Sequence, residues 1–249
     1  MELFDEEFVT DLVAFVISAA CVTAYYLFLN MKVRGNPTYS IHGVNALSRR
    51  LWVEHVMRSN SAKDIMAVQT LRNFIMAPSL MASSAALLII GTLTLSGQAE
   101  NISHSWHVLS LGGSHATALW IVKVMLLLVD FIVAFFAFAM SVRLANHVLF
   151  MVNVPEQGSH HTLSPRAVAH RLNRAGNMFA IGMRAFFFAI PLVFWLFGPY
   201  FFLISSIGLV LALYRLDRSE CEEVCESGSG STAPTQNAPV VSMHAKFAK

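Results

Sequence analysis

Residues 116–140 read ATALWIVKVMLLLVDFIVAFFAFAM and are almost entirely apolar. Only Lys123 and Asp130 are charged within it. A bilayer core about 30 Å thick is crossed by about 20 mainly apolar residues in a helix, so the stretch is long enough to span. Helix is the only conformation open to it, because a spanning segment must satisfy its backbone hydrogen bonds inside lipid. The stretch therefore predicts a transmembrane helix.

Three further apolar runs have spanning length, at about residues 12–29, 74–95 and 185–214. The last run is longer than one crossing needs and contains Pro191 and the pair Gly198–Pro199. Its two halves are each too short to span alone, so we expect one helix with a kink at the prolines. The alternative is a re-entrant hairpin that turns back at Gly198–Pro199. The prediction is an all-α, polytopic transmembrane helix bundle with four spans.

The composition supports a membrane protein and excludes several other classes. The chain has 249 residues, of which 55% are hydrophobic and 13% charged, and its mean hydropathy is +0.57. An ordinary soluble domain is about 25% charged. A disordered protein, a basic nucleic-acid binder and most soluble enzymes are therefore excluded. We expect the lipid bilayer as a partner, no nucleic acid, and one transmembrane domain over residues 1–217 before a disordered tail at 218–249.

The basic residues are distributed unevenly between the loops. Segments 31–73 and 141–184 hold most of the Lys and Arg residues, whereas segment 96–115 and the residues before the first run hold none. Because positive charge favours the cytosolic side, both basic segments are predicted to be cytosolic and the N-terminus to lie outside or in a lumen. Plasma membrane and endomembrane both stay open. Asn101 begins a glycosylation sequon in the outer loop, and its modification stays open as well.

Asp130 is the main candidate for a functional residue, because it lies near the middle of its span. A bare carboxylate there costs at least about 2.5–3.5 kcal/mol on insertion scales. One interpretation is a substrate or ion pathway formed by Asp130 with Lys123, Ser83 and Ser84. The other is a protonated or hydrogen-bonded carboxyl that holds two helices together. Lys123 lies near the outer end of its span, where we expect its ammonium group to reach the headgroups.

The cytosolic segment after the first span is predicted to be helical. Val44, Leu47 and Leu51 form an apolar stripe at helical spacing, and Arg49 and Arg50 lie away from that stripe. We therefore expect a helix that covers the cytosolic ends of the bundle with this stripe turned inward.

The second cytosolic segment is also predicted to contain helix. The third spanning helix should run on to about Asn153, and Ser164 with Pro165 fits a helix cap followed by the first helical position. Four arginines are candidate contacts for anionic lipid headgroups or an acidic partner: Arg49, Arg50, Arg166 and Arg174. The alternative for all of them is a solvated or headgroup-facing edge without a specific ligand.

The predicted outer loop carries His104, His107 and His115, whose imidazoles are weak candidate ligands for zinc or copper. Their spacing is unspecific, so we expect no metal site and no cofactor. The sequence contains no nucleophile elbow, phosphate loop, HExxH or CxxC motif. An enzyme is therefore the least favoured class, and no catalytic residue is assigned.

Several motifs occur in the order found in one membrane family. They are Lys32-Val33-Arg34, the run from Gly43 through Asn45 to Arg49-Arg50-Leu51-Trp52, Ala67-Val68-Gln69-Thr70-Leu71-Arg72-Asn73, Met81-Ala82-Ser83-Ser84, Arg143 to Asn146, Ile190-Pro191-Leu192, Trp195-Leu196-Phe197-Gly198-Pro199 and Leu213-Tyr214. Over about residues 8–217 the chain resembles the integral membrane family catalogued as domain of unknown function 599, and is most similar to its plant members. The resemblance implies several membrane helices. It implies no activity, substrate or catalytic residue.

Taken together, the residues favour the movement or gating of a small solute or ion through the helix bundle. The alternative is a non-catalytic membrane scaffold or partner-binding subunit, and a metal-dependent membrane enzyme ranks third. A homo-oligomer is compatible with each of these functions.

Overall fold

The computed structural model describes residues 2–36, 39–58, 64–97, 117–154 and 163–218. They form the helices α1 (Glu2–Gly35), α2 (Ile41–Arg58), α3 (Asp64–Gly97), α5 (Thr117–Val152), α6 (Pro165–Trp195) and α7 (Pro199–Asp217). Apart from one isolated bridge between Ser40 and Arg218, these ranges contain no strand pairing. The all-α prediction is therefore confirmed.

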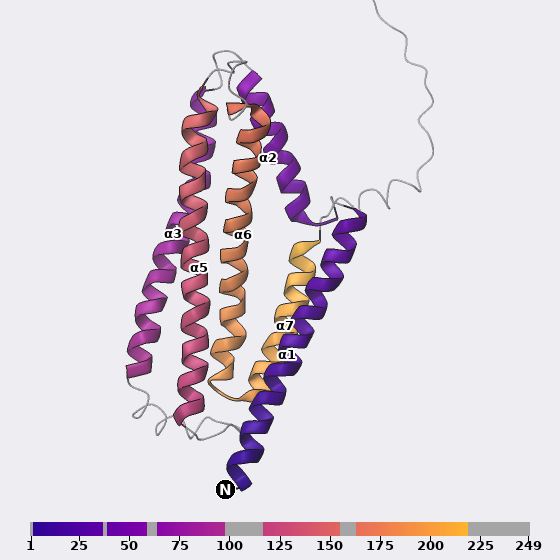
Figure 1. Cartoon of the computed structure of the whole chain (residues 1–249), viewed down its shortest axis with the longest axis vertical. Coiled ribbons are helices and arrows are strands. Elements are labelled where there is room, and N and C mark those ends of the chain that lie inside the picture. Colours follow the sequence, from indigo (N-terminus) through magenta and orange to yellow (C-terminus); the bar gives the residue numbers. More distant parts are fainter. Residues whose placement is uncertain (1, 37–38, 59–63, 98–116, 155–162, 219–249) are drawn as a thin grey trace, which may run out of the picture. The chain divides into compact units, whose positions relative to one another are not determined.

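Five of these helices, α1, α3, α5, α6 and α7, are long and apolar enough to cross a membrane. The chain fits a multi-pass membrane protein, but the predicted number of four spans is wrong. The run at 185–214 contains the end of α6 and most of α7, and the chain turns back between them at Gly198 (Figure 1). Gly198 has a φ of 143°, which favours glycine. Pro199 begins α7, where its missing N–H is tolerated.

The error in the number of spans has a physical cause. The apolar run marks only the last part of α6, which begins at Pro165 and has 31 residues. The first half of the run is therefore the end of a long helix and not a short one. α7 has 19 residues, which extend about 28 Å at 1.5 Å per residue. The turn at Gly198 matches the alternative that the chain folds back there.

The membrane helices follow one another as packed neighbours (Figure 1). α5 packs against α3 and α6, α6 also packs against α7, and α7 packs against α1. α1 and α7 run parallel, because Ser18 contacts Ser206 and, further along both helices, Tyr25 contacts Asp217. α2 packs mainly against α6.

The contact between α1 and α7 follows a periodic stripe in each helix. The stripe residues are buried and lie three, four or seven positions apart: Asp11, Ala14, Ser18, Tyr25 and Leu29 in α1, and Phe202, Ser206, Leu209, Leu213 and Asp217 in α7. This spacing puts them on one face of each helix. Within the contact, Ser18 Oγ donates a hydrogen bond to Ser206 Oγ over 2.7 Å. The stripe thus contains polar groups that pair with each other.

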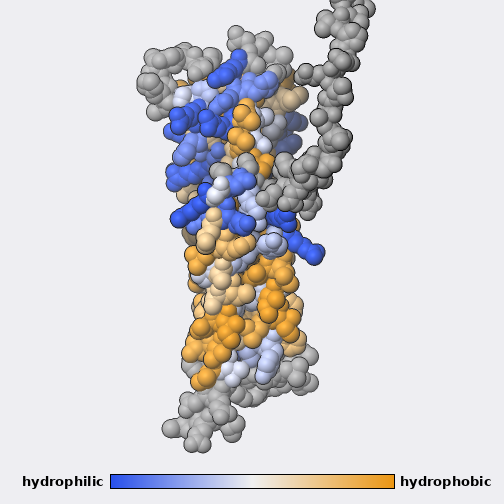
Figure 2. Space-filling view, turned by 90° about the vertical axis from the view of Figure 1, so that its right-hand side faces the viewer, coloured by the Kyte–Doolittle hydropathy of each residue, from blue (hydrophilic) through white to orange (hydrophobic). Residues whose placement is uncertain are grey.

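Hydropathy divides the helical part of the molecule into two halves. Figure 2 shows hydrophobic residues gathered over one half and hydrophilic residues over the other. The hydrophobic residues include large exposed side chains such as Leu87 of α3, Phe136 of α5 and Ile204 of α7. Contact with a lipid bilayer is compatible with these apolar side chains, because lipid removes them from water.

α2 does not turn the predicted stripe inward. Its buried residues are Val53 and Val56, while Leu47 and Leu51 are 47% and 56% exposed. The two valines join a core cluster with residues of α3, α5 and α6, among them Leu71, Val148 and Leu172. The predicted stripe is wrong because Arg49 shares the face of Val53 and Val56 and inserts its guanidinium group against α6.

Two local predictions about segment 141–184 are confirmed. α5 runs to Val152, next to the predicted end at Asn153. Ser164 caps α6: its Oγ accepts a hydrogen bond from Ala167 N over 3.4 Å, and Pro165 is the first helical residue. α5 and α6 therefore extend beyond their apolar runs and provide the surface on which α2 packs.

Candidate functional site

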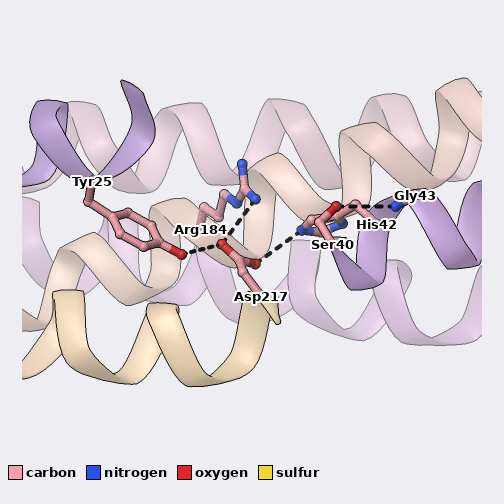
Figure 3. A network of polar contacts seen from close by, with 6 residues as sticks. All are labelled: Tyr25, Ser40, His42, Gly43, Arg184 and Asp217. Atoms are coloured by element: carbon pink, nitrogen blue, oxygen red, sulfur yellow. Dashed lines mark hydrogen bonds and ion pairs between the residues drawn. The ribbon is translucent and has the colours of Figure 1, made fainter. Parts of the chain in front are cut away.

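Asp217 lies at the end of α7 and joins four helices (Figure 3). Tyr25 Oη of α1 donates a hydrogen bond to Asp217 Oδ2 over 2.8 Å, and Arg184 Nη2 of α6 lies 3.4 Å from the same oxygen. His42 Nε2 of α2 lies 3.4 Å from Asp217 Oδ1. Asp217 is 5% exposed, and a buried carboxylate needs such partners. These four residues are called the Asp217 cluster.

The start of α2 holds His42 beside Asp217. Ser40 precedes the helix, and its Oγ accepts a hydrogen bond from Gly43 N over 3.3 Å (Figure 3), which is the contact of a helix cap. The bridge between Ser40 and Arg218 joins this point to the end of α7. The first turn of α2 is therefore fixed next to the last turn of α7.

A cavity of about 550 Å³ lies beside the Asp217 cluster, between α1, α2 and α6. Its apolar wall includes Leu27, Val33 and Ile181. Its hydrogen-bonding and charged side chains are Thr23, Tyr26, Asn30, Ser40, His42, Asn177 and Arg184. Small-ligand pockets have this size and this mixture of an apolar wall with a few polar groups.

Tyr26 differs from its neighbour Tyr25 in the state of its hydroxyl. Tyr26 Oη is buried and makes no hydrogen bond within the described part of the chain. The guanidinium of Arg184 lies over the Tyr26 ring, with Cζ 5.2 Å from the ring centroid, which is a cation–π distance. A buried hydroxyl without a partner is unfavourable, and Tyr26 keeps such an unpaired donor packed beside the cavity and out of reach of solvent.

The charges around the cavity favour an anion. The described lining contains Arg184 and the titratable His42 and no carboxylate. Asp217 contacts both of these residues but does not line the cavity, and both of its carboxylate oxygens are in contact with members of the Asp217 cluster. Guanidinium, hydroxyl and amide donors around one space suit a phosphate or carboxylate ligand.

A second polar cluster joins α1, α5 and α6. Lys123 Nζ lies 3.0 and 3.1 Å from the two carboxylate oxygens of Asp11, and Trp195 Nε1 donates to Asp11 Oδ1 over 3.0 Å. Asp11 and Lys123 are 1% and 5% exposed. The expectation that Lys123 reaches the headgroups is therefore wrong, because its ammonium group turns inward to a buried carboxylate. These three residues are called the Asp11 cluster.

Asp130 is half-buried in α5, and its Oδ2 atom is buried without a hydrogen-bond partner in the described ranges. Ser83 and Ser84 are exposed on α3 and donate to carbonyl oxygens one turn earlier in their own helix, over 3.2 and 3.1 Å. Lys123 pairs with Asp11. Among the described residues, the structure therefore brings none of the three predicted pathway partners into hydrogen bonding with Asp130.

Arg49 is packed between α2 and α6. Its Nε donates to Asn173 Oδ1 over 2.8 Å, and Asn173 Nδ2 in turn donates to Ala46 O over 3.1 Å. A Cβ at Gly176 would lie 2.6 Å from Arg49 Cζ, so the absence of a side chain there makes room for the guanidinium. Burial lowers the pKa of Arg49 from its usual value. Arg49 is thus largely committed to joining two helices.

The other three arginine candidates lie at the surface. Arg50 forms an ion pair with Glu54 one turn later, with 3.2 Å between Nε and Oε1. Arg166 and Arg174 are exposed on α6. An exposed pair such as Arg50 with Glu54 contributes little to stability.

Several predictions fall outside the described residues. They concern the histidines His104, His107 and His115, the sequon at Asn101, and the tail at 218–249, of which only Arg218 is described. Among the residues that are described, no group of three or more His, Cys, Asp or Glu side chains could hold a metal ion.

Sequence reasoning missed the Asp217 cluster and Asp11. Arg184 stands immediately before the apolar run at 185–214, and Asp217 follows it closely. A hairpin inside that run brings its two ends together, so this pair is detectable once a turn at Gly198 is assumed. Asp11 and Lys123 are 112 residues apart, and no local pattern connects them.

Comparison with known proteins agrees with the motifs found in the sequence. The family described as "Protein of unknown function, DUF599" matches residues 13–221. No curated protein and no solved structure matches the chain. The matched range contains the whole Asp217 cluster, the cavity beside it and Asp130. The chain therefore belongs to the family described as "Protein of unknown function, DUF599".

Proposed function

We propose that the protein moves or gates a small solute or ion through its helix bundle. The observation that carries this proposal is the carboxyl group of Asp130, whose Oδ2 atom is buried in a membrane-length helix without a partner among the described residues. An ionisable group inside a membrane helix is unfavourable and usually functional. Such a group suits a proton or cation pathway, because its oxygen is not already occupied by a hydrogen bond among the described residues.

Asp130 lies between the two polar clusters along α5. Lys123 of the Asp11 cluster precedes it by seven positions, about 10 Å along a helix. Toward the other end, Phe138 packs against the backbone of α6 at Gly182, two positions from Arg184 of the Asp217 cluster. The carboxyl group thus has one cluster on either side of it along the span.

The two clusters are suited to close the ends of a pathway. The Asp11 cluster joins α1 to α5 and α6, and the Asp217 cluster joins α1 and α7 to α6 and α2. Breaking the Asp217 cluster would release the end of the α1–α7 pair that lies near α2. Breaking the Asp11 cluster would release α1 from α5 and α6, while the turn at Gly198 still holds the start of α7 to α6. Alternate breaking of the clusters would expose Asp130 first from one side and then from the other.

We also propose an orientation with the N-terminus outside. Segments 31–73 and 141–184, which contain α2 and the first part of α6, carry most of the basic residues and are assigned to the cytosol. Five crossings bring the end of α7 to the same side, so Arg215 and Arg218 also follow the rule. Arg166 and Arg174 then face cytosolic headgroups or an acidic partner. Plasma membrane and endomembrane both fit this orientation.

Flux measurements on reconstituted protein test the pathway. The full-length protein is placed in proteoliposomes that contain a pH-sensitive dye, and a gradient of protons, Na⁺ or K⁺ is imposed. We expect Asp130→Asn, which removes the charge and keeps the size, to lower the flux at least about tenfold, a barrier change of about 1.4 kcal/mol. The unfolding temperature in detergent should remain near that of the parent protein.

A matched control is Glu54→Gln, the same acid-to-amide change at a residue that pairs with Arg50 outside the membrane helices. It should leave the flux unchanged. Ser83→Ala and Ser84→Ala should have smaller effects than Asp130→Asn, because both hydroxyls bond within α3. Parent-like flux in a correctly folded Asp130→Asn protein would overturn the pathway.

The second candidate function is a membrane scaffold or partner-binding subunit, alone or as a homo-oligomer. Ile41, Leu47 and Leu51 favour it, since they are 41%, 47% and 56% exposed on α2, outside the membrane-length helices. A partner could cover these side chains. Unchanged flux in Asp130→Asn together with loss of a co-purifying partner in Leu47→Ser and Leu51→Ser would favour the scaffold over the pathway.

A further inference from the structure

We propose that the cavity between α1, α2 and α6 binds the phosphate group of an anionic lipid. This site is separate from Asp130, and its occupation can be measured without any flux. The basic residues that the sequence singled out as headgroup contacts, Arg49, Arg50, Arg166 and Arg174, do not line this cavity.

The donors for a phosphate converge from three helices. Arg184 uses Nη2 for Asp217, while its Nε and Nη1 atoms make no hydrogen bond among the described residues. The Tyr26 ring also lines the cavity, while its Oη atom is buried out of reach of solvent. Asn177 and His42 belong to the lining as well. Arginine binds phosphate through paired N–H donors, and the Asn177 side-chain amide adds another donor.

Asp217 is shared between two of the side chains that line the cavity. Its carboxylate contacts Arg184 through one oxygen and His42 through the other. The side chains of His42 and Arg184 are 37% and 27% exposed, which leaves them accessible. Tyr25 donates a further hydrogen bond to Oδ2, so both carboxylate oxygens are already engaged within the cluster.

The position and the wall of the cavity favour a lipid as the source of the phosphate. Its α1 residues lie in the last turns before the basic end of that helix at Lys32 and Arg34, where headgroups are expected. Leu27, Val33 and Ile181 provide an apolar wall. Free phosphate gains nothing from apolar contacts with this wall, whereas the first carbons of a lipid acyl chain can pack against it. At about 550 Å³ the space fits a headgroup and not a whole lipid.

Thermal unfolding of the purified full-length protein in a neutral detergent tests this site. The probes are dioleoyl phosphatidic acid, dioleoyl phosphatidylcholine and inorganic phosphate. We expect phosphatidic acid to raise the unfolding temperature in a saturable way and the other two to do so weakly. Equal stabilisation by inorganic phosphate would support the phosphate site and identify a soluble source. Equal stabilisation by phosphatidylcholine would overturn the proposal, because its choline group cancels the charge.

Variants locate the binding within the cavity. Tyr26→Phe removes only a hydroxyl that is buried out of reach of solvent, so the protein should still fold and should bind phosphatidic acid like the parent protein. Ala180→Leu fills the cavity from α6 and should abolish the shift. Arg184→Gln should weaken binding by at least about tenfold. Arg58→Gln, at the exposed end of α2 and outside the cavity lining, is the matched control and should bind like the parent protein. Parent-like binding by both Arg184→Gln and Ala180→Leu would overturn the assignment.

Discussion

Trp195 Nε1 donates a hydrogen bond to Asp11 Oδ1 over 3.0 Å and thereby joins the end of α6 to α1. The indole ring also stacks on Phe202 of α7, with ring centroids 4.9 Å apart. Trp195 precedes the turn at Gly198 and Phe202 follows it. The Trp195 side chain of α6 therefore contacts both α7, the second arm of the hairpin, and α1, which packs beside α7.

Trp195→Phe should destabilise the protein while keeping the aromatic stack. The variant loses the donor to Asp11 and leaves a buried carboxylate with one partner fewer, which costs about 1–3 kcal/mol. Unfolding in detergent, followed by circular dichroism, measures the loss. A variant as stable as the parent protein would show that the hydrogen bond is not needed to hold α6 against α1.

Lys123→Met alone should lower the free energy of unfolding more than Lys123→Met combined with Asp11→Leu. The single change leaves Asp11 buried without its countercharge and is expected to lower the free energy of unfolding by about 3–5 kcal/mol. Asp11→Leu combined with Lys123→Met removes both charges and should recover most of that loss. Arg50→Gln, at an exposed pair, should change stability by less than about 1 kcal/mol. No recovery in the double variant would contradict this account.

Replacement by phenylalanine should lower the stability of the protein at Tyr25 but not at the adjacent Tyr26. Tyr25→Phe removes the donor to Asp217 Oδ2 and should lower the free energy of unfolding by about 1–3 kcal/mol. Tyr26→Phe removes a buried hydroxyl without a described partner and should leave the lipid-free protein equally stable or slightly more stable. Chemical unfolding in lipid-free detergent compares the pair. Equal losses in both variants would mean that the Asp217 contact does not distinguish them.

Replacement of glycine by alanine should lower the stability of the protein at Gly182 of α6 and raise it at Gly91 of α3. At Gly182 a Cβ would lie 2.6 Å from the Phe138 ring, so Gly182→Ala should separate α5 from α6 and cost about 1–3 kcal/mol. At Gly91 nothing lies within 4 Å of a built Cβ, so Gly91→Ala should stabilise α3 by up to about 1 kcal/mol. The unfolding temperatures of both variants provide the test. A tolerated Gly182→Ala would argue against close packing of α5 on α6.

The proposed orientation predicts which positions an impermeant thiol reagent reaches in sealed cells. With the native cysteines replaced by serine, Tyr200→Cys at the start of α7 should react. Arg50→Cys and Arg215→Cys should react only after the cells are permeabilised. Reaction of Arg50→Cys in intact cells would reverse the orientation. Reaction of Arg215→Cys alone would mean that α7 ends on the outer side.

The sequence predicts the helices well because their signals are local. Apolar length identifies the spans, and Ser164 with Pro165 fixes the start of α6 through a contact three residues away. The number of spans is harder to predict. One helix kinked at Pro191 and two helices joined by a turn at Gly198 would show the same apolar run in the sequence. The apolar run contains only the end of α6, because hydropathy does not mark the polar first part of that 31-residue helix, and the first arm of the hairpin is therefore hard to recognise as a separate helix.

The candidate site is less predictable because its contacts are long-range. Asp217 meets Tyr25 across 192 residues, and nothing near either residue indicates the other. The inward face of α2 is difficult to predict for a related reason. Arg49 counts as polar in any periodicity, yet the missing side chain at Gly176 lets it pack on the buried face.

The parallel contact of α1 with α7 has a consequence for biogenesis. α1 is synthesised long before α7, the helix against which it packs. Until α7 is made, the Ser18 hydroxyl and the Tyr25 phenol lack their partners Ser206 and Asp217. A nascent chain that stops after α6 therefore carries unpaired polar groups along one face of α1.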